Sequence, residues 1–210
     1  SLRRQRQMCI RDRSTGKKKS QRHSKNRHME KKCPCYVEGK NTEKRMDMSK
    51  ALFITGTGTD IGKTYVTGLI VKKLAEEGKS AAYYKAAMSG NDRRADGSLI
   101  PGDALFVQKI SGITQPLEEM CPYVYEHAYS PHLASRIEGH PVEMAVVRDG
   151  YRAVCDKYDY VTVEGSGGIL CPICFDEAKI QLEDVVSELG LSSICLLYTS
   201  DAADEGLGVD

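Results

Sequence analysis

The sequence of 210 residues has no apolar run close to the roughly 20 residues that a helix needs to span a bilayer. Its N-terminal residues carry positive charge without an apolar segment, so they do not predict a secretory signal. The eight cysteines lie at irregular spacing, which indicates reduced thiols rather than a disulfide framework. We therefore expect a cytoplasmic protein that makes no contact with a membrane.

The net charge of +1 hides an uneven distribution along the chain. Residues 1–50 hold 17 Lys and Arg against 5 Asp and Glu, a charge of +12. The remaining 160 residues hold 13 against 24, a charge of −11, so this part lacks the basic footprint of a nucleic-acid-binding domain. We expect no nucleic-acid partner, although a basic arm that touches nucleic acid is an alternative for the N-terminal part.

Both ends of the chain differ in composition from the middle. Residues 1–47 are rich in Lys, Arg, Ser, Asn and Gln without periodicity, which predicts a disordered flank. RRQRQMCIRDR near the beginning and LLYTSDAADE near the end resemble translated sequencing-adapter sequence. We therefore expect residues 1–47 and 197–210 to be non-native, and the domain over 48–196 to have Met48 as its natural start.

Residues 48–196 show alternating strand and helix patterns. Apolar runs predict strands at 50–55, 80–86, 159–165 and 192–197. Helices are predicted at 63–79, 103–110, 130–139, 141–158 and 179–190, the first from the spacing of Val66, Leu69, Ile70, Lys73 and Leu74, with Gly78 at its end. Strands separated by helices predict an α/β fold, a P-loop NTPase-like parallel sheet flanked by helices on both faces.

The segment GTGTDIGKT, residues 56–64, lies where the first strand meets the first helix. The general phosphate-loop pattern G-x-x-x-x-G-K-[ST] requires glycine where the chain has Thr57, so the strict pattern fails. Backbone N–H groups and a helix N-terminus would still face an anion at this junction. Lys63 would reach the terminal phosphates and the Thr64 hydroxyl would ligate Mg²⁺. We interpret the segment as a nucleotide site; a glycine-rich turn without a ligand is the alternative.

The same segment resembles the loop G-T-x-T-x-x-G-K-T of dethiobiotin synthetases, ATP-dependent enzymes of biotin synthesis. YYKAAMSG is similar to the family's Y-K-P-x-x-S-G, with Ala86 in place of proline. GDALFVQ, SPHLA and VTVEGSGG also match, so the resemblance runs from about Met48 to Leu196. In parallel sheets of this kind ligands bind beyond the carboxyl ends of the strands, where these motifs fall.

The resemblance implies roles for particular residues. Lys63 and Lys85 would be catalytic, since two positive charges suit a transferring phosphoryl group. Thr64, Asp103 and Glu164 would ligate Mg²⁺, and Thr59 and Ser89 would hydrogen-bond the substrate. Contacts with ATP are implied for Asp60, Ile61, Gly62, Lys63, Thr64, Tyr65, Asp103, Glu164, Gly165, Ser166 and Gly167.

Some of these residues have structural alternatives. Asp103 could be a helix N-cap, and Lys85 could be a solvated lysine at a sheet edge. His132 could be a general base or a structural histidine at a helix start, next to Ser130 as N-cap. Tyr83, Tyr84, Tyr123, Tyr125 and Tyr129 are expected to serve in core and loop packing.

The implied reaction is the ring-closing carboxylation of 7,8-diaminononanoate with CO₂ to dethiobiotin, with ATP and Mg²⁺ as cofactors and, for the full-length protein, a homodimer as the assembly. It would pass through a carbamate and a carbamic–phosphoric anhydride. Family members continue beyond the matched region with an adenine loop and a segment that completes the substrate pocket across the dimer interface. We therefore expect a C-terminally truncated fold, a loss that can leave the chain itself inactive.

Other functions remain open at this point. Partitioning ATPases carry a signature lysine early in the loop, which is absent here, whereas amidotransferases of the cobyrinate diamide synthase type share the loop. A non-enzymatic protein that binds DNA through its basic arm is a third possibility. The cysteines Cys33, Cys35, Cys171 and Cys174 could supply four thiolates to zinc, but the first pair lies in the expected flank, so we expect no zinc.

Overall fold

The computed structural model describes residues 50–176 and 178–197. The predictions for residues 1–47, for Met48 and for the tail from 198 onward lie outside this part of the chain. Within the described residues, no helix is both long enough and apolar enough to cross a membrane.

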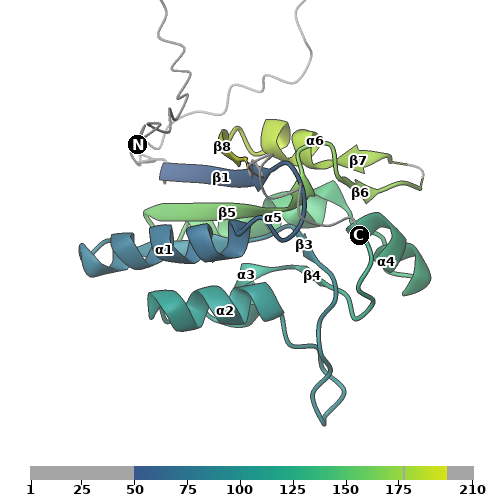
Figure 1. The fold of residues 1–210 in the computed structure, drawn as a ribbon, viewed down its shortest axis with the longest axis horizontal. Coiled ribbons are helices and arrows are strands. Elements are labelled where there is room, and N and C mark those ends of the chain that lie inside the picture. Colours follow the sequence, from purple (N-terminus) through teal and green to yellow (C-terminus); the bar gives the residue numbers. More distant parts are fainter. Residues whose placement is uncertain (1–49, 177, 198–210) are drawn as a thin grey trace, which may run out of the picture. The chain divides into compact units, whose positions relative to one another are not determined.

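Four parallel strands form the central sheet, in the order β2-β5-β1-β8. Figure 1 labels three of them, β5, β1 and β8. They are β1 (Lys50–Gly56), β2 (Ala81–Tyr84), β5 (Tyr160–Gly168) and β8 (Ser192–Leu196). β1 lies between two partners, so that Leu52 pairs with Thr162 of β5 and with Ser192 of β8. The four predicted strands and their parallel arrangement are confirmed.

The predicted helices are also present. They are α1 (Lys63–Glu76), α2 (Gly102–Ser111), α4 (Pro131–Ile137), α5 (Met144–Cys155) and α6 (Leu182–Glu188). The prediction missed α3 (Leu117–Met120) and the short strands β3 (Ala87–Met88), β4 (Tyr123–Val124), β6 (Pro172–Cys174) and β7 (Ile180–Gln181). Elements of two to four residues are too short for a hydrophobic period to appear in the sequence.

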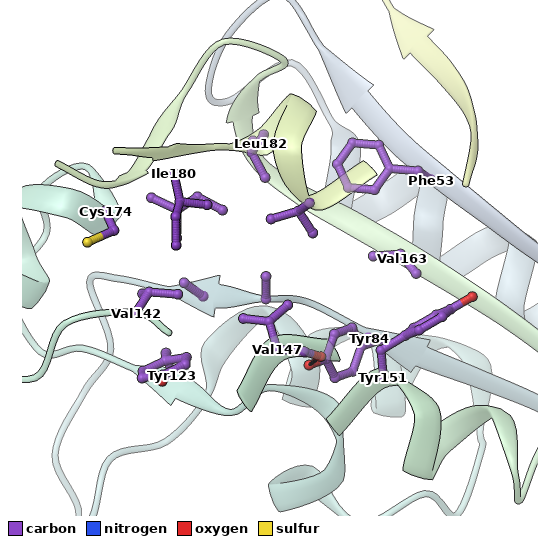
Figure 2. Packing of buried hydrophobic residues seen from close by; sticks show 14 of the residues in the cluster. Phe53, Tyr84, Tyr123, Val142, Val147, Tyr151, Val163, Cys174, Ile180 and Leu182 are labelled. Carbon is purple, nitrogen blue, oxygen red and sulfur yellow. Dashed lines mark hydrogen bonds between the residues drawn. The ribbon is translucent and has the colours of Figure 1, made fainter. Parts of the chain in front are cut away.

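Residues of β2 alternate between two cores on opposite faces of the sheet. Tyr84 belongs to the larger core, together with Val147 of α5 and Leu182 of α6 (Figure 2). Tyr83 belongs to the other core, together with Val71 of α1 and residues of α2. Successive strand side chains point to opposite faces, so α1 and α2 cover one face and α5 and α6 the other. The predicted layers are therefore confirmed.

The buried face of α1 differs from the series of residues that predicted the helix. Its buried residues are Lys63, Thr67, Gly68 and Val71, whereas Leu69 is 41% exposed. Gly68 brings α1 close to α2, because a Cβ atom at this position would lie 2.5 Å from Cγ2 of Ile110. Contact between two helix backbones selects small residues here, and an apolar series does not reveal such a contact.

β5 continues past residue 165, where the predicted strand ended. It extends to Gly168, with a shift of register against β1 between Ile54 and Gly56. Gly165 permits this close packing, since a Cβ atom there would lie 3.0 Å from Cζ of Phe53. Gly165 therefore serves the packing of the strand against β1.

The last predicted helix begins later than expected. Ile180 pairs with Cys174 in an antiparallel ribbon, so this part of the predicted helix is strand β7. α6 begins at Leu182, where Gln181 and Asp184 form a capping box.

Candidate functional site

The loop between β1 and α1 has the geometry of an anion site. Asp60 and Gly62 have positive φ values of 56° and 86°. Left-handed residues in such loops turn neighbouring N–H groups toward one side, where they form a concave site for an anion. No side chain caps the N-terminus of α1, so its first N–H groups are available to a ligand.

A cavity of about 570 Å³ opens beside this loop, at the carboxyl ends of β1 and β2. It is lined by Thr59, Asp60, Gly62, Lys63, Thr64, Tyr65, Lys85, Met88, Ser89, Asp103, Phe106, Glu164 and Ser166. The cavity thus brings together the predicted site residues except Ile61, Gly165 and Gly167. Those three are absent from the lining: the Ile61 side chain packs over Gly56, Gly165 packs against Phe53, and Gly167 packs against Cys171.

Glu164 lies at the centre of a hydrogen-bond network in this cavity. Its side chain is 1% exposed, and its Oε1 accepts from Thr64 Oγ1 at 2.8 Å and from Lys85 Nζ at 3.0 Å. Its Oε2 accepts from the Tyr83 hydroxyl at 2.9 Å. Lys85 Nζ also donates to Asp103 Oδ2 at 2.6 Å. The predicted ligands of Mg²⁺ therefore meet around one buried ammonium group.

The structural alternatives for Lys85 and Asp103 do not hold. Lys85 is 5% exposed and is bonded to two carboxylates, so it is not a solvated edge lysine. Pro101 occupies the N-cap position of α2, and Asp103 lies within the first turn of that helix. The Asp103 carboxylate is therefore not used to cap α2 and points to Lys85 instead.

The oxygen donors of the site fit Mg²⁺. This ion prefers one or two carboxylates together with phosphate oxygens and water, and the cavity offers Asp103, Glu164 and the Thr64 hydroxyl. Among the described residues, no three His, Cys, Asp or Glu side chains converge on a metal position. A cation held here would therefore complete its coordination with oxygens from a ligand or water.

Comparison with known proteins decides the family. A family model described as an AAA domain matches residues 50–196. ATP-dependent dethiobiotin synthetases of Clostridium perfringens strain 13 and Brachyspira hyodysenteriae are each 48% identical to the chain. That of Clostridium botulinum strain Loch Maree is 46% identical, and each match covers 77% of this chain and 68% of the relative. The chain belongs to the dethiobiotin synthetase family.

In this dethiobiotin synthetase family member, the pKa values of the two buried lysines are shifted in opposite directions. Burial lowers the pKa of Lys85, but the adjacent carboxylates of Glu164 and Asp103 outweigh it and hold the pKa above its usual range. Burial also lowers the pKa of Lys63, and the positive charge of Lys85 lowers it further. Lys63 Nζ donates to the carbonyl of Gly58 rather than to a carboxylate. The charge of Lys63 is thus the one that an incoming anion would stabilise.

Two serine hydroxyls face the cavity with their protons already engaged. Ser89 Oγ donates to the carbonyl of Tyr129 at 2.6 Å, and Ser166 Oγ donates to the carbonyl of Ala87 at 2.6 Å. Each oxygen keeps lone pairs that can accept from a ligand N–H group. The sequence motifs predicted both residues but not this polarity.

The structure places the predicted histidine outside this cavity. Ser130 is the N-cap residue of α4, as predicted, but its Oγ contacts His132 Nδ1 at 3.0 Å instead of a backbone N–H. The His132 ring lies against Phe175, with centroids 5.9 Å apart. His132 is absent from the lining of the cavity.

Sequence reasoning missed Met88, Phe106 and Tyr83. Met88 and Phe106 line the cavity, and a position one helical turn after Asp103 could have indicated Phe106. Tyr83 was expected to pack in the core, and it does, but its hydroxyl also reaches Glu164. Burial, together with the negative charge of Glu164, raises the pKa of Tyr83, so the phenol remains a donor. Tyr129, also expected to pack, is 52% exposed.

Proposed function

We propose that the chain catalyses the ATP-dependent ring-closing carboxylation of 7,8-diaminononanoate with CO₂, which yields dethiobiotin, ADP and phosphate. Membership of the family supports an ATP-dependent step of biotin synthesis. The observation that carries the proposal is the convergence of two lysines, two carboxylates and a threonine hydroxyl in one cavity beside an anion-binding loop. We also infer a cytoplasmic location, where ATP is supplied.

The phosphates of ATP would bind between the loop and the N-terminus of α1. Uncapped N–H groups and Lys63 supply the positive potential there. Burial lowers the pKa of Lys63, which means that its ammonium charge is poorly stabilised in the free protein. A phosphate bound beside Lys63 would supply the negative counter-charge. Binding of the triphosphate therefore relieves an electrostatic cost that is present in the free protein.

Thr64, Asp103 and Glu164 would hold Mg²⁺, which when bound neutralises charge on the phosphate oxygens. Lys85 already balances the two carboxylates, at 2.6 and 3.0 Å. With a cation held by both carboxylates, less of the Lys85 charge would be needed to balance them. The Lys85 ammonium would then be available to a negatively charged substrate.

The amines of the substrate would lie near Ser89 and Thr59, which line the same cavity as the two lysines. The Ser89 proton is engaged by the carbonyl of Tyr129, so its oxygen accepts from an amine N–H. This contact would orient the diamine with its reacting nitrogens toward the phosphate loop.

The reaction needs control of charge rather than an enzyme nucleophile. The 7-amino nitrogen adds to the carbon of CO₂ and loses a proton, which gives a carbamate. A carbamate oxygen attacks the γ-phosphorus and ADP leaves, which gives the carbamic–phosphoric anhydride. The 8-amino nitrogen then attacks the carbonyl carbon, the ring closes, and the carbon–oxygen bond to phosphate breaks. Lys63 and Lys85 would stabilise the negative charge that spreads over the transferring phosphoryl group.

Release of ADP tests this proposal. With the full chain and Mg-ATP, ADP release should rise only when the diamine and bicarbonate are both present, because the carbamate is the phosphoryl acceptor. ADP release that is independent of the diamine would indicate a simple ATPase. Release that depends on glutamine and an organic acid would indicate an amidotransferase instead.

We further infer that two copies of the chain associate, as the family resemblance implies for the full-length protein. Leu133 and Ile137 lie one turn apart on α4 and are 37% and 49% exposed, and Phe175 beside α4 is 49% exposed. These apolar side chains suit a surface that another copy covers. Sedimentation of the full chain should show a dimer that Ile137→Asp dissociates, whereas the matched change Val146→Asp on α5 should not. Dissociation by both variants alike, or a monomeric parent, contradicts this interface.

A further inference from the structure

We propose that Tyr83 is a positioning residue that fixes the Glu164 carboxylate for cation binding, an inference that rests on the proposed function. Tyr83 is fully buried, and its hydroxyl donates to Glu164 Oε2 at 2.9 Å. Oε1 is thereby left to Thr64 Oγ1 and Lys85 Nζ on the cavity side. Each oxygen of the carboxylate thus has its own partner.

The hydroxyl matters because it restrains that oxygen of Glu164. Among the described residues, Oε2 has no second hydrogen-bond donor. Without the phenol, rotation about the last side-chain bond would exchange the two oxygens or turn one away from the cavity. Loss of an outer partner that orients a metal-binding carboxylate in this way typically weakens metal affinity by about 10- to 100-fold.

The backbone of Tyr83 is itself held from outside the sheet. β2 is an edge strand of the central sheet in the described part of the chain. The buried Gln115 amide takes the place of a neighbouring strand: its Oε1 accepts from Tyr83 N–H at 2.8 Å and its Nε2 donates to the Tyr83 carbonyl at 3.0 Å. Gln108 Nε2 in turn donates to the Gln115 carbonyl at 2.8 Å. This clamp fixes the strand position from which the phenol reaches Glu164.

The next residue provides a matched control. Tyr84 is also fully buried, but its hydroxyl donates to the carbonyl of Val147 at 2.7 Å on the opposite face of the sheet. Figure 2 shows Tyr84 beside Tyr151 in that core. Tyr84→Phe and Tyr83→Phe therefore each remove one buried hydroxyl and one hydrogen bond from the same strand. Of the two hydroxyls, only that of Tyr83 contacts a residue that lines the cavity.

The test is the affinity of the full chain for Mn²⁺, measured by electron paramagnetic resonance with a non-hydrolysable ATP analogue bound. Glu164→Gln should weaken Mn²⁺ binding strongly, and Tyr83→Phe should weaken it about 10-fold or more. Tyr84→Phe should leave the affinity within about twofold of the parent, although it also loses one buried hydrogen bond and melts at a lower temperature.

The outcomes separate this inference from the proposed function. Unchanged Mn²⁺ affinity in Glu164→Gln would overturn the cation site of the proposed function. Weak binding in Glu164→Gln with parental binding in Tyr83→Phe would overturn the positioning role alone. Equal weakening in Tyr83→Phe and Tyr84→Phe would show a general structural effect and would also overturn it.

Discussion

Replacement of Lys85 by alanine is expected to lower kcat by about 100-fold or more, the scale of losing one preorganised electrostatic group. The Lys85 ammonium is buried and lies within 3.0 Å of both carboxylates of the cavity. Its charge would act on the carbamate and the transferring phosphoryl group, where negative charge builds up. A group that acts mainly in the transition state changes kcat more than it changes substrate affinity.

The measurement is steady-state ADP release with diamine, bicarbonate and Mg-ATP. Lys79→Ala serves as the control, because Lys79 is exposed beyond the end of α1. Near-normal turnover in Lys85→Ala would remove Lys85 from the mechanism.

Replacement of Lys63 by methionine is expected to lower kcat/KM for Mg-ATP by about 100-fold, again the scale of one lost charge in a preorganised site. Lys63 is the first residue of α1 and is 7% exposed at the phosphate loop. Methionine keeps most of the buried stem and removes the charge together with the hydrogen bond to the Gly58 carbonyl. An unchanged kcat/KM would show that the loop does not bind the phosphates.

The two lysines should also differ in the sign of their effect on stability. The pKa of Lys63 is lower in the folded than in the unfolded chain, so its charge opposes folding at neutral pH. The pKa of Lys85 is raised by its carboxylates, so its charge favours folding below the unfolded pKa. Lys63→Met should therefore melt at the parental temperature or above. Lys85→Met should melt well below it, because breaking a buried ion pair costs about 3–5 kcal/mol. The opposite order in a thermal melt would contradict the charge balance described for the cavity.

The sequence revealed the chemistry of the site better than its packing. Lys85, Asp103 and Glu164 could be predicted because each stands at a strand end or helix start, and such ends meet at one edge of a parallel sheet. The parallel order of the strands followed from their separation by helices. These features depend on the order of residue types within short segments, which can be read from a single sequence.

Contacts between distant residues could not be predicted in the same way. The apolar strand pattern placed Tyr83 in the core but did not show that its hydroxyl reaches Glu164, 81 positions away in sequence. Gln115 substitutes for a missing strand, a role that depends on the sheet order and not on its neighbours in sequence. Likewise, the contact of Gly68 with α2 follows from the distance between two helices.

The most direct test of the central claim follows oxygen from bicarbonate to phosphate. The full chain, in molar excess over ATP, is supplied with the diamine and with bicarbonate labelled in its oxygens with the heavy isotope, and the products are analysed by mass spectrometry. If a carbamate oxygen attacks the γ-phosphorus, the released phosphate carries one oxygen from bicarbonate and the ureido carbonyl of dethiobiotin carries another. Dethiobiotin formed together with unlabelled phosphate, or ADP formed without dethiobiotin, would contradict the account.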